Sequence, residues 1–117
     1  RVICRRTHDS LMAQFDVHHN LGRHKDSIPF VVIVQSSQFE GYRRRVVVPL
    51  VRASAIGPVS FPTFNPAFTI KGTKVVLHPL EIVSVSTGQL GKKVGSLTEA
   101  GQLIATALDE LFSRAWQ

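Results

Sequence analysis

The sequence predicts a mainly β domain of the α+β or small-barrel type, in which an antiparallel sheet is followed by one C-terminal α-helix. Two observations carry this prediction. Short apolar segments rich in β-branched and aromatic residues recur between residues 15 and 85 and are separated by turn residues. A longer segment whose apolar residues recur at helical spacing then follows them. Several strands before a lone helix favour antiparallel pairing.

The first three strands are predicted from three different patterns. Phe15–His18 alternates apolar and polar residues, as in a half-buried strand. Ile28–Val34 is almost entirely β-branched or aromatic, which is typical of a central strand buried on both faces. Arg45–Leu50 is a further apolar strand. Because Pro49 has no backbone N–H, it predicts an edge, a bulge or the end of that strand.

A hairpin is predicted next, from Phe68–Ile70 and a strand over 73–78 that are joined by the turn pair Lys71-Gly72. A short strand is expected around Ile82–Val85, and none is predicted for 87–95.

The segment 52–66 is expected to be an irregular, extended loop. Its prolines Pro58, Pro62 and Pro66 recur every four residues, which blocks a helix. The rings of Phe61 and Phe64 are expected to dip into the core.

The helix is predicted from its cap and its stripe. Ser96 and Glu99 have the spacing of a capping box. Gly101 lies in the first turns and weakens the helix by about 1 kcal/mol relative to alanine. The apolar stripe consists of Leu97, Ala100, Leu103, Ile104, Ala107, Leu108 and Leu111.

Composition narrows the class of protein. A chain of 117 residues fits one domain. Its net charge of +6 is compatible with an acidic protein or nucleic acid as partner, but no dense basic stripe interleaved with aromatics supports nucleic acid alone. Cys4 is the only cysteine, which excludes an internal disulfide and favours a cytoplasmic setting. No apolar run has the length of a membrane span.

Residues 1–11 are interpreted as a non-native or disordered leader, and residues 12–117 as a single domain. The only methionine, Met12, opens a segment that leads directly into the first predicted strand. A short, genuine N-terminal extension is the alternative.

The sequence contains no recognisable catalytic or metal-binding constellation. His18, His19 and His24 have no Asp, Glu or Cys partner at a ligand spacing and are expected to be exposed loop residues. No serine lies in a nucleophile elbow, and no glycine-rich loop has the spacing of a phosphate site. The function is therefore expected to lie in a binding surface, and no cofactor is expected.

Two features are candidates for that surface. Arg43, Arg44 and Arg45 either bind carboxylates or phosphates, or form a solvated cluster that protects an edge strand from aggregation. Trp116, the only tryptophan, is either an exposed binding residue or folds back onto the sheet or across a dimer interface.

Several motifs together resemble the CcdB family of toxins from plasmid and chromosomal toxin–antitoxin pairs. The segment Met12-Ala13-Gln14-Phe15-Asp16-Val17 is similar to the family's opening Met-Gln-Phe strand. Phe30-Val31-Val32-Ile33-Val34-Gln35-Ser36 resembles Phe-Val-Asp-Val-Gln-Ser, and Pro66-Ala67-Phe68-Thr69-Ile70 resembles Pro-x-x-x-Ile. The most specific element is Arg44-Arg45-Val46-Val47-Val48-Pro49-Leu50, which resembles Arg-Arg-x-Val-Ile-Pro-Leu.

The resemblance implies a homodimer of Src-homology-3-like barrels, each with a C-terminal helix. It also implies a bacterial toxin that is not an enzyme. Such a toxin binds the DNA gyrase A subunit, traps the gyrase–DNA cleavage complex and is neutralised by a CcdA-like antitoxin with a disordered tail. Under this reading Phe112, Arg114 and Trp116 are the gyrase-binding candidates. Arg43, Arg44 and Arg45 are the candidates for binding antitoxin or another acidic partner.

The C-terminus departs from the family pattern. The family has Trp-Gly-Ile directly after the final Phe of the helix, whereas Phe112 is followed by Ser113-Arg114-Ala115-Trp116-Gln117. The tryptophan is displaced by three residues, and since a helical turn has 3.6 residues, we expect it to return to nearly the same face. This departure leaves three alternatives open: weak poisoning of gyrase, poisoning of another topoisomerase, or a non-toxic homologue that only binds antitoxin. A separate alternative is an endoribonuclease of the MazF/Kid type, which shares the barrel, with Arg44 and Arg45 in a basic groove.

Overall fold

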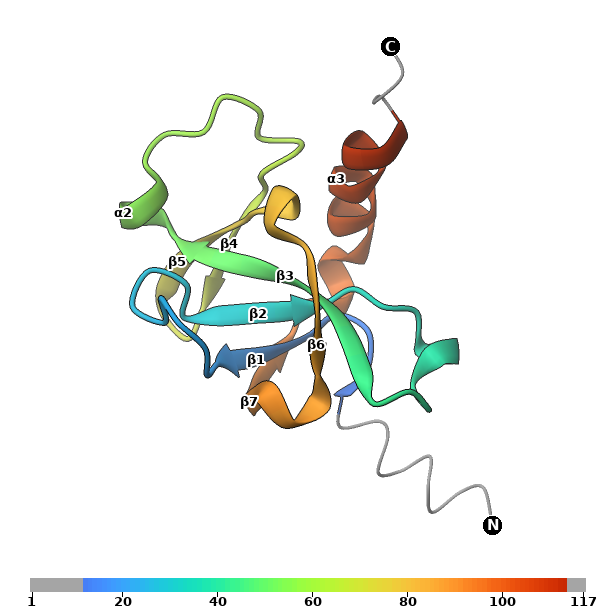
Figure 1. The fold of residues 1–117 in the computed structure, drawn as a ribbon. Helices are drawn as coiled ribbons and strands as arrows, with labels where there is room; N and C mark the ends of the chain where they lie inside the picture. The colour runs from blue at the N-terminus through green and yellow to red at the C-terminus, as the bar shows by residue number, and fades with distance from the viewer. Residues whose placement is uncertain (1–11, 114–117) are drawn as a thin grey trace.

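The computed structural model describes residues 12–113, which form a strongly curled antiparallel sheet with one helix packed against it (Figure 1). This arrangement confirms the predicted fold class. The strands are β1 (Asp16–Asn20), β2 (Phe30–Ile33), β3 (Arg44–Arg52), β4 (Ala67–Ile70), β5 (Thr73–Leu77), β6 (Val83–Ser86) and β7 (Leu90–Ser96). The helix is α3 (Gly101–Ser113), and α2 (Ala53–Ile56) is a single turn. Short 3₁₀ turns occupy Ser37–Phe39, Pro79–Glu81, Thr87–Gln89 and Thr98–Ala100.

The sheet has the strand order β4-β5-β3-β2-β1-β7, and β6 pairs with the remaining free part of β3. The long strand β3 holds this half-barrel together. It pairs with β2 on one side, and on the other side first with β6 and then with β5. Since β3 is central, the interpretation of Arg43, Arg44 and Arg45 as guards of an edge strand is wrong.

Pro49 lies inside β3, and not at an edge, a bulge or the strand end. The carbonyl of Val46 accepts from the N–H of Val34 in the β2 direction, whereas the carbonyl of Pro49 accepts from His78 on the opposite side. The nitrogen of Pro49 therefore points to the place where β6 gives way to β5 as the partner of β3. A residue without an N–H costs no ladder hydrogen bond at this position.

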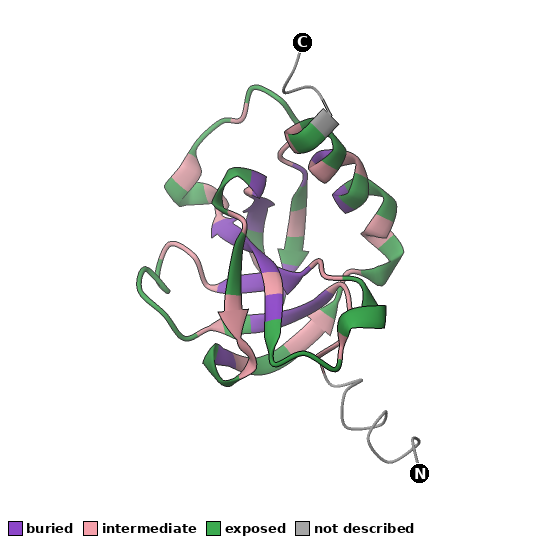
Figure 2. Cartoon of the chain, turned by 45° about the vertical axis from the view of Figure 1, so that its right-hand side comes forward, coloured by how far each residue is buried: buried purple, intermediate pink, exposed green. Residues whose placement is uncertain are grey.

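The buried residues are concentrated in the central strands and on one side of α3 (Figure 2). They form two clusters, one on each face of the central strands. Val32 packs toward α3, whereas Val31 and Ile33 pack on the other face, so β2 is buried on both faces as its composition predicted. The helix contributes Ile104 and Ala107, which are both fully buried.

The α3 stripe is narrower than the sequence predicted. Leu103 is 55% exposed although it has stripe spacing. The capping-box prediction is wrong as well, because Ser96 is still paired with Asp16 in the sheet. Its hydroxyl accepts from the N–H of Thr98, and a 3₁₀ turn precedes the helix.

The predicted β4–β5 hairpin is confirmed. Lys71 and Gly72 both have positive φ, 50° and 79°, as a type I′ turn requires. The irregular segment predicted over 52–66 is shorter in the structure, because Arg52 ends β3 and Ala53–Ile56 form α2. Residues 57–66 are irregular as expected, but the ring of Phe61 is 70% exposed and does not enter the core. The ring of Phe64 is half-buried.

Strand β7 was not predicted, and its pairing with β1 changes the interpretation of His18. The lysines of β7 are typical of an edge strand, and Lys93 pairs with buried Asp16 at 3.4 Å. His18 is only 2% exposed, so its prediction as an exposed loop residue is wrong. Its Nδ1 lies 2.8 Å from the carbonyl oxygen of Gly91 and donates to it, since a carbonyl only accepts.

Gly91→Ala is expected to destabilise the fold by about 1–3 kcal/mol, through overpacking between β1 and β7. A Cβ on Gly91 would lie 2.8 Å from the Cβ of His19 and 2.9 Å from its backbone oxygen. The matched control is Gly95→Ala on the same strand, where a Cβ meets nothing within 4 Å. Urea unfolding followed by circular dichroism measures both, and equal midpoints for the two variants would contradict the steric argument.

Candidate functional site

The C-terminal end of α3 presents an apolar side chain beside a large groove. Phe112 is 63% exposed, and the preceding residue, Leu111, lines the groove. Arg114 and Trp116, the other two residues predicted to bind gyrase, lie outside the described residues. The exposure of Phe112 leaves its ring available to a partner.

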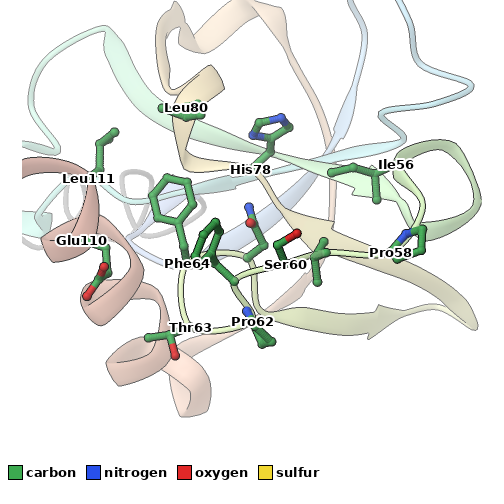
Figure 3. A pocket seen from close by; sticks show the side chains of 13 residues that line it. Ile56, Pro58, Ser60, Pro62, Thr63, Phe64, His78, Leu80, Glu110 and Leu111 are labelled. Carbon is green, nitrogen blue, oxygen red and sulfur yellow. The ribbon is translucent and has the colours of Figure 1, made fainter.

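The groove has a volume of about 1070 Å³ and lies between α3, the Pro79–Glu81 turn and the irregular segment before β4. Figure 3 shows that Leu111 from α3, Leu80 from the turn and Phe64 from the irregular segment all line this groove. The complete lining is Ile56, Pro58, Val59, Ser60, Phe61, Pro62, Thr63, Phe64, Asn65, His78, Leu80, Glu110 and Leu111.

The sequence produces this groove for local reasons. Three prolines keep 58–66 out of both helix and sheet, and most of its side chains stay exposed. Asn65 then ties the segment to β5, because its side-chain amide donates to the carbonyl of Leu77 at 3.1 Å. The exposed rings and leucines suit the binding of apolar side chains, and the sequence alone did not predict the groove.

Arg43 and Arg44 are both exposed at the start of β3. The Nε of Arg44 donates to the hydroxyl of Ser84, and its Nη2 donates to the carbonyl of Ser84, each at 2.8 Å. A guanidinium carries five N–H donors, so Arg44 keeps donors for a further acceptor. Both guanidiniums are therefore accessible from the surface.

Arg45 has a different environment and does not fit its predicted role in partner binding. Its side chain is only 3% exposed. The guanidinium donates to the carbonyls of Met12 (3.1 Å), Glu40 (2.9 Å), Tyr42 (2.5 Å) and Arg44 (3.0 Å). Strand alternation explains the difference, because Arg45 points to the opposite face from Arg44. Arg45 is therefore a structural residue that holds the chain around it.

A pair of exposed aromatic rings beside Arg43 was also missed by the sequence reasoning. Phe39 is 43% exposed and Tyr42 is 68% exposed. Their ring centroids are 6.2 Å apart in an edge-to-face arrangement. The signal in the sequence that could have indicated this exposed pair is two aromatic residues in an otherwise polar turn next to arginines.

Within residues 12–113, no group of three or more His, Cys, Asp or Glu side chains is placed to hold a metal ion. In the same part of the chain, no helix has the length and apolarity needed to cross a membrane.

Comparison with known proteins identifies the family. Solved structures that share the fold include an endoribonuclease in complex with its cognate antitoxin and an endoribonuclease, both from mycobacterial species. The first has a TM-score of 0.65 and 19% identity over 92% of this chain and 98% of that chain. The second has a TM-score of 0.63 and 16% identity over 92% and 96%. At such identities the likeness shows the fold alone.

A sequence search of curated proteins finds no significant match. A sequence profile of the CcdB protein family matches residues 14–113, which include every strand and the helix α3. The chain therefore belongs to the CcdB family of toxins from toxin–antitoxin systems.

Proposed function

We propose that this chain is a toxin that binds the DNA gyrase A subunit and traps the gyrase–DNA cleavage complex. The single observation that carries the proposal is the CcdB family match from the first strand to the end of α3. The exposed Phe112 at the end of that helix supports it, because large apolar side chains at such positions are frequent anchors in protein interfaces. The toxin acts by binding, without catalysis, and a CcdA-like antitoxin neutralises it.

The proposed active form is a homodimer in the cytoplasm. The chain leaves several large apolar residues exposed, among them Phe61, Leu80 and Phe112 around the groove. Exposed apolar patches of this kind mark protein–protein contacts. Static light scattering at micromolar concentration tests the dimer, and a monomeric mass would count against it.

Phe112→Ala is expected to abolish or strongly reduce killing, since removing an interface anchor commonly costs about 2 kcal/mol or more of binding. The test expresses the toxin from a tight promoter in two bacterial strains, one with wild-type gyrase and one with a gyrase A allele resistant to this family. Leu103→Ala is the matched control, an equally exposed apolar residue earlier on the same helix. Trp116→Ala tests the displaced tryptophan in the same assay.

Death of the sensitive strain alone, lost with Phe112→Ala and kept with Leu103→Ala, is the expected result. Death of both strains would move the target away from gyrase. Survival of both strains with folded protein would favour a non-toxic homologue that only binds antitoxin.

A second candidate function is RNA cleavage, because the two solved structures compared above are described as endoribonucleases. Of the two arginines that the sequence suggested for an RNA groove, only Arg44 is exposed. Incubating the purified chain with RNA tests this candidate. Cleavage that is lost with Arg44→Ala and kept with Lys71→Ala, an exposed lysine on a distant hairpin, would establish it.

A further inference from the structure

The aromatic pair Phe39 and Tyr42 lies on a loop that the protein holds firmly in place. Gln35 donates to the carbonyls of Phe39 (3.0 Å) and Arg44 (3.2 Å) and accepts from the N–H of Val46 (3.0 Å). From the inner side, the buried guanidinium of Arg45 donates to the carbonyls of Glu40 and Tyr42. An exposed loop fixed by two side chains is preorganised, and preorganisation lowers the entropic cost of binding.

The rings of Phe39 and Tyr42 are exposed to solvent but pack against each other. At 6.2 Å between centroids and 61° between planes, they form one edge-to-face unit. An isolated exposed aromatic residue needs no explanation, whereas two packed on each other and left uncovered are a ready apolar contact.

Positive charge stands directly beside this apolar contact. Arg43 and Arg44 follow Tyr42 in the chain and are both exposed. Arg44 is steered toward β6 by its two hydrogen bonds to Ser84. The carbonyl of Arg43 accepts from the N–H of Thr87 at 2.9 Å, which fixes the backbone of that arginine as well. The only carboxylate on the loop is Glu40, which is half-buried.

We propose that Phe39, Tyr42, Arg43 and Arg44 form a docking surface for an acidic peptide segment that carries an apolar anchor. The aromatic pair receives the anchor, and the two guanidiniums receive the flanking carboxylates. The proposal rests on the proposed function, in which an antitoxin supplies that segment. Arg45 is a positioning residue for this surface, since it holds the loop without being exposed.

A peptide fits these observations better than a nucleic acid does. Single-stranded nucleic acid is bound by a groove in which several cations follow the backbone beside successive stacking rings. Here two arginines flank one edge-to-face pair, which matches a short peptide with one anchor. The surface is also separate from the groove at α3, because the turn before β3 and the irregular segment after α2 adjoin opposite ends of β3 (Figure 1).

The test measures binding of short fluorescent peptides to the full chain by anisotropy. One peptide combines glutamates with a central leucine and tryptophan, a second has glutamines in place of glutamates, and a third has alanines in place of the apolar pair. A uridine oligonucleotide is the nucleic-acid probe. The variants are Tyr42→Ala and Arg43→Gln, with Leu103→Ala and Lys71→Gln as matched exposed controls on other surfaces. Tyr42→Ala keeps the backbone carbonyl to which Arg45 donates.

We expect the acidic anchored peptide to bind, and Tyr42→Ala and Arg43→Gln to weaken it about tenfold each, with both controls unchanged. Binding is expected to weaken as salt is raised, because the arginine contacts are exposed. Equal binding of the neutral or anchorless peptide, equal binding by the variants, or no binding would overturn the proposal. Tighter binding of the oligonucleotide, lost with the same two substitutions, would overturn it in favour of RNA. The purified chain is used throughout, so a failure here is distinguishable from a failure of the gyrase test in cells.

Discussion

Replacing Arg45 with alanine is expected to lower the free energy of unfolding by about 3–5 kcal/mol, because it removes the guanidinium donor from the partly buried carbonyl oxygens of Met12, Glu40 and Tyr42. The guanidinium donates to four carbonyls, and its side chain is only 3% exposed. A hydrogen bond from a charged donor contributes about 1.5–3 kcal/mol. Release of a buried charge offsets part of the loss.

The neighbouring Arg44→Ala separates this effect from a general effect of charge. Arg44 carries the same charge on the same strand but is exposed, so its loss is expected to cost about 1 kcal/mol or less. Arg45→Lys keeps the positive charge but lacks the planar guanidinium with its several donors. Its loss of unfolding free energy is therefore expected to lie between those of the two alanine variants. Chemical denaturation with a spectroscopic readout compares all three. If Arg45→Ala unfolded at the same denaturant concentration as Arg44→Ala, the structural role of Arg45 would be wrong.

Ile104→Ala is expected to cost about 2–5 kcal/mol, which is the range for truncating a large aliphatic side chain in a packed core. Ile104 is fully buried against the α3 side of the sheet and belongs to the larger core cluster. No other described residue of α3 except Ala107 is fully buried, so the attachment of the helix depends strongly on this one side chain.

Leu103→Ala is the matched control for this second prediction. Leu103 is adjacent to Ile104, has a side chain of the same atom count and is 55% exposed. Surface substitutions of this kind change stability by about 0.5 kcal/mol or less. Thermal unfolding monitored by circular dichroism measures both variants. A larger loss for Leu103→Ala than for Ile104→Ala would show that the helix packs in a different rotation.

Arg45 also links the fold to the proposed binding surface. Its hydrogen bonds hold the loop that carries Phe39 and Tyr42. The same side chain therefore stabilises the start of β3 and fixes the geometry of the exposed rings. This explains why a charged side chain is kept in a buried position, where an apolar side chain of similar size satisfies no carbonyl.

Local patterns in the sequence determined much of the fold. The β-branched run at 28–34 predicted the buried strand β2, because only a strand covered on both faces is apolar throughout. Lys71-Gly72 predicted the hairpin, because glycine readily adopts the positive φ that a tight turn requires. The helix and the CcdB family motifs were also readable in the sequence, since both depend on spacing along the chain.

Only the tertiary structure decided which side of each element is covered. Strand β7 has the composition of a loop, and its pairing with β1 makes it a strand and buries His18. Leu103 is exposed and Ile104 is buried because α3 turns the side of Ile104 toward the sheet. Arg44 and Arg45 differ in the same way, because alternate residues of β3 point to opposite faces. The groove beside α3 arises from segments far apart in sequence. In each case the deciding interactions are between distant parts of the chain, and these leave no periodic pattern in the sequence.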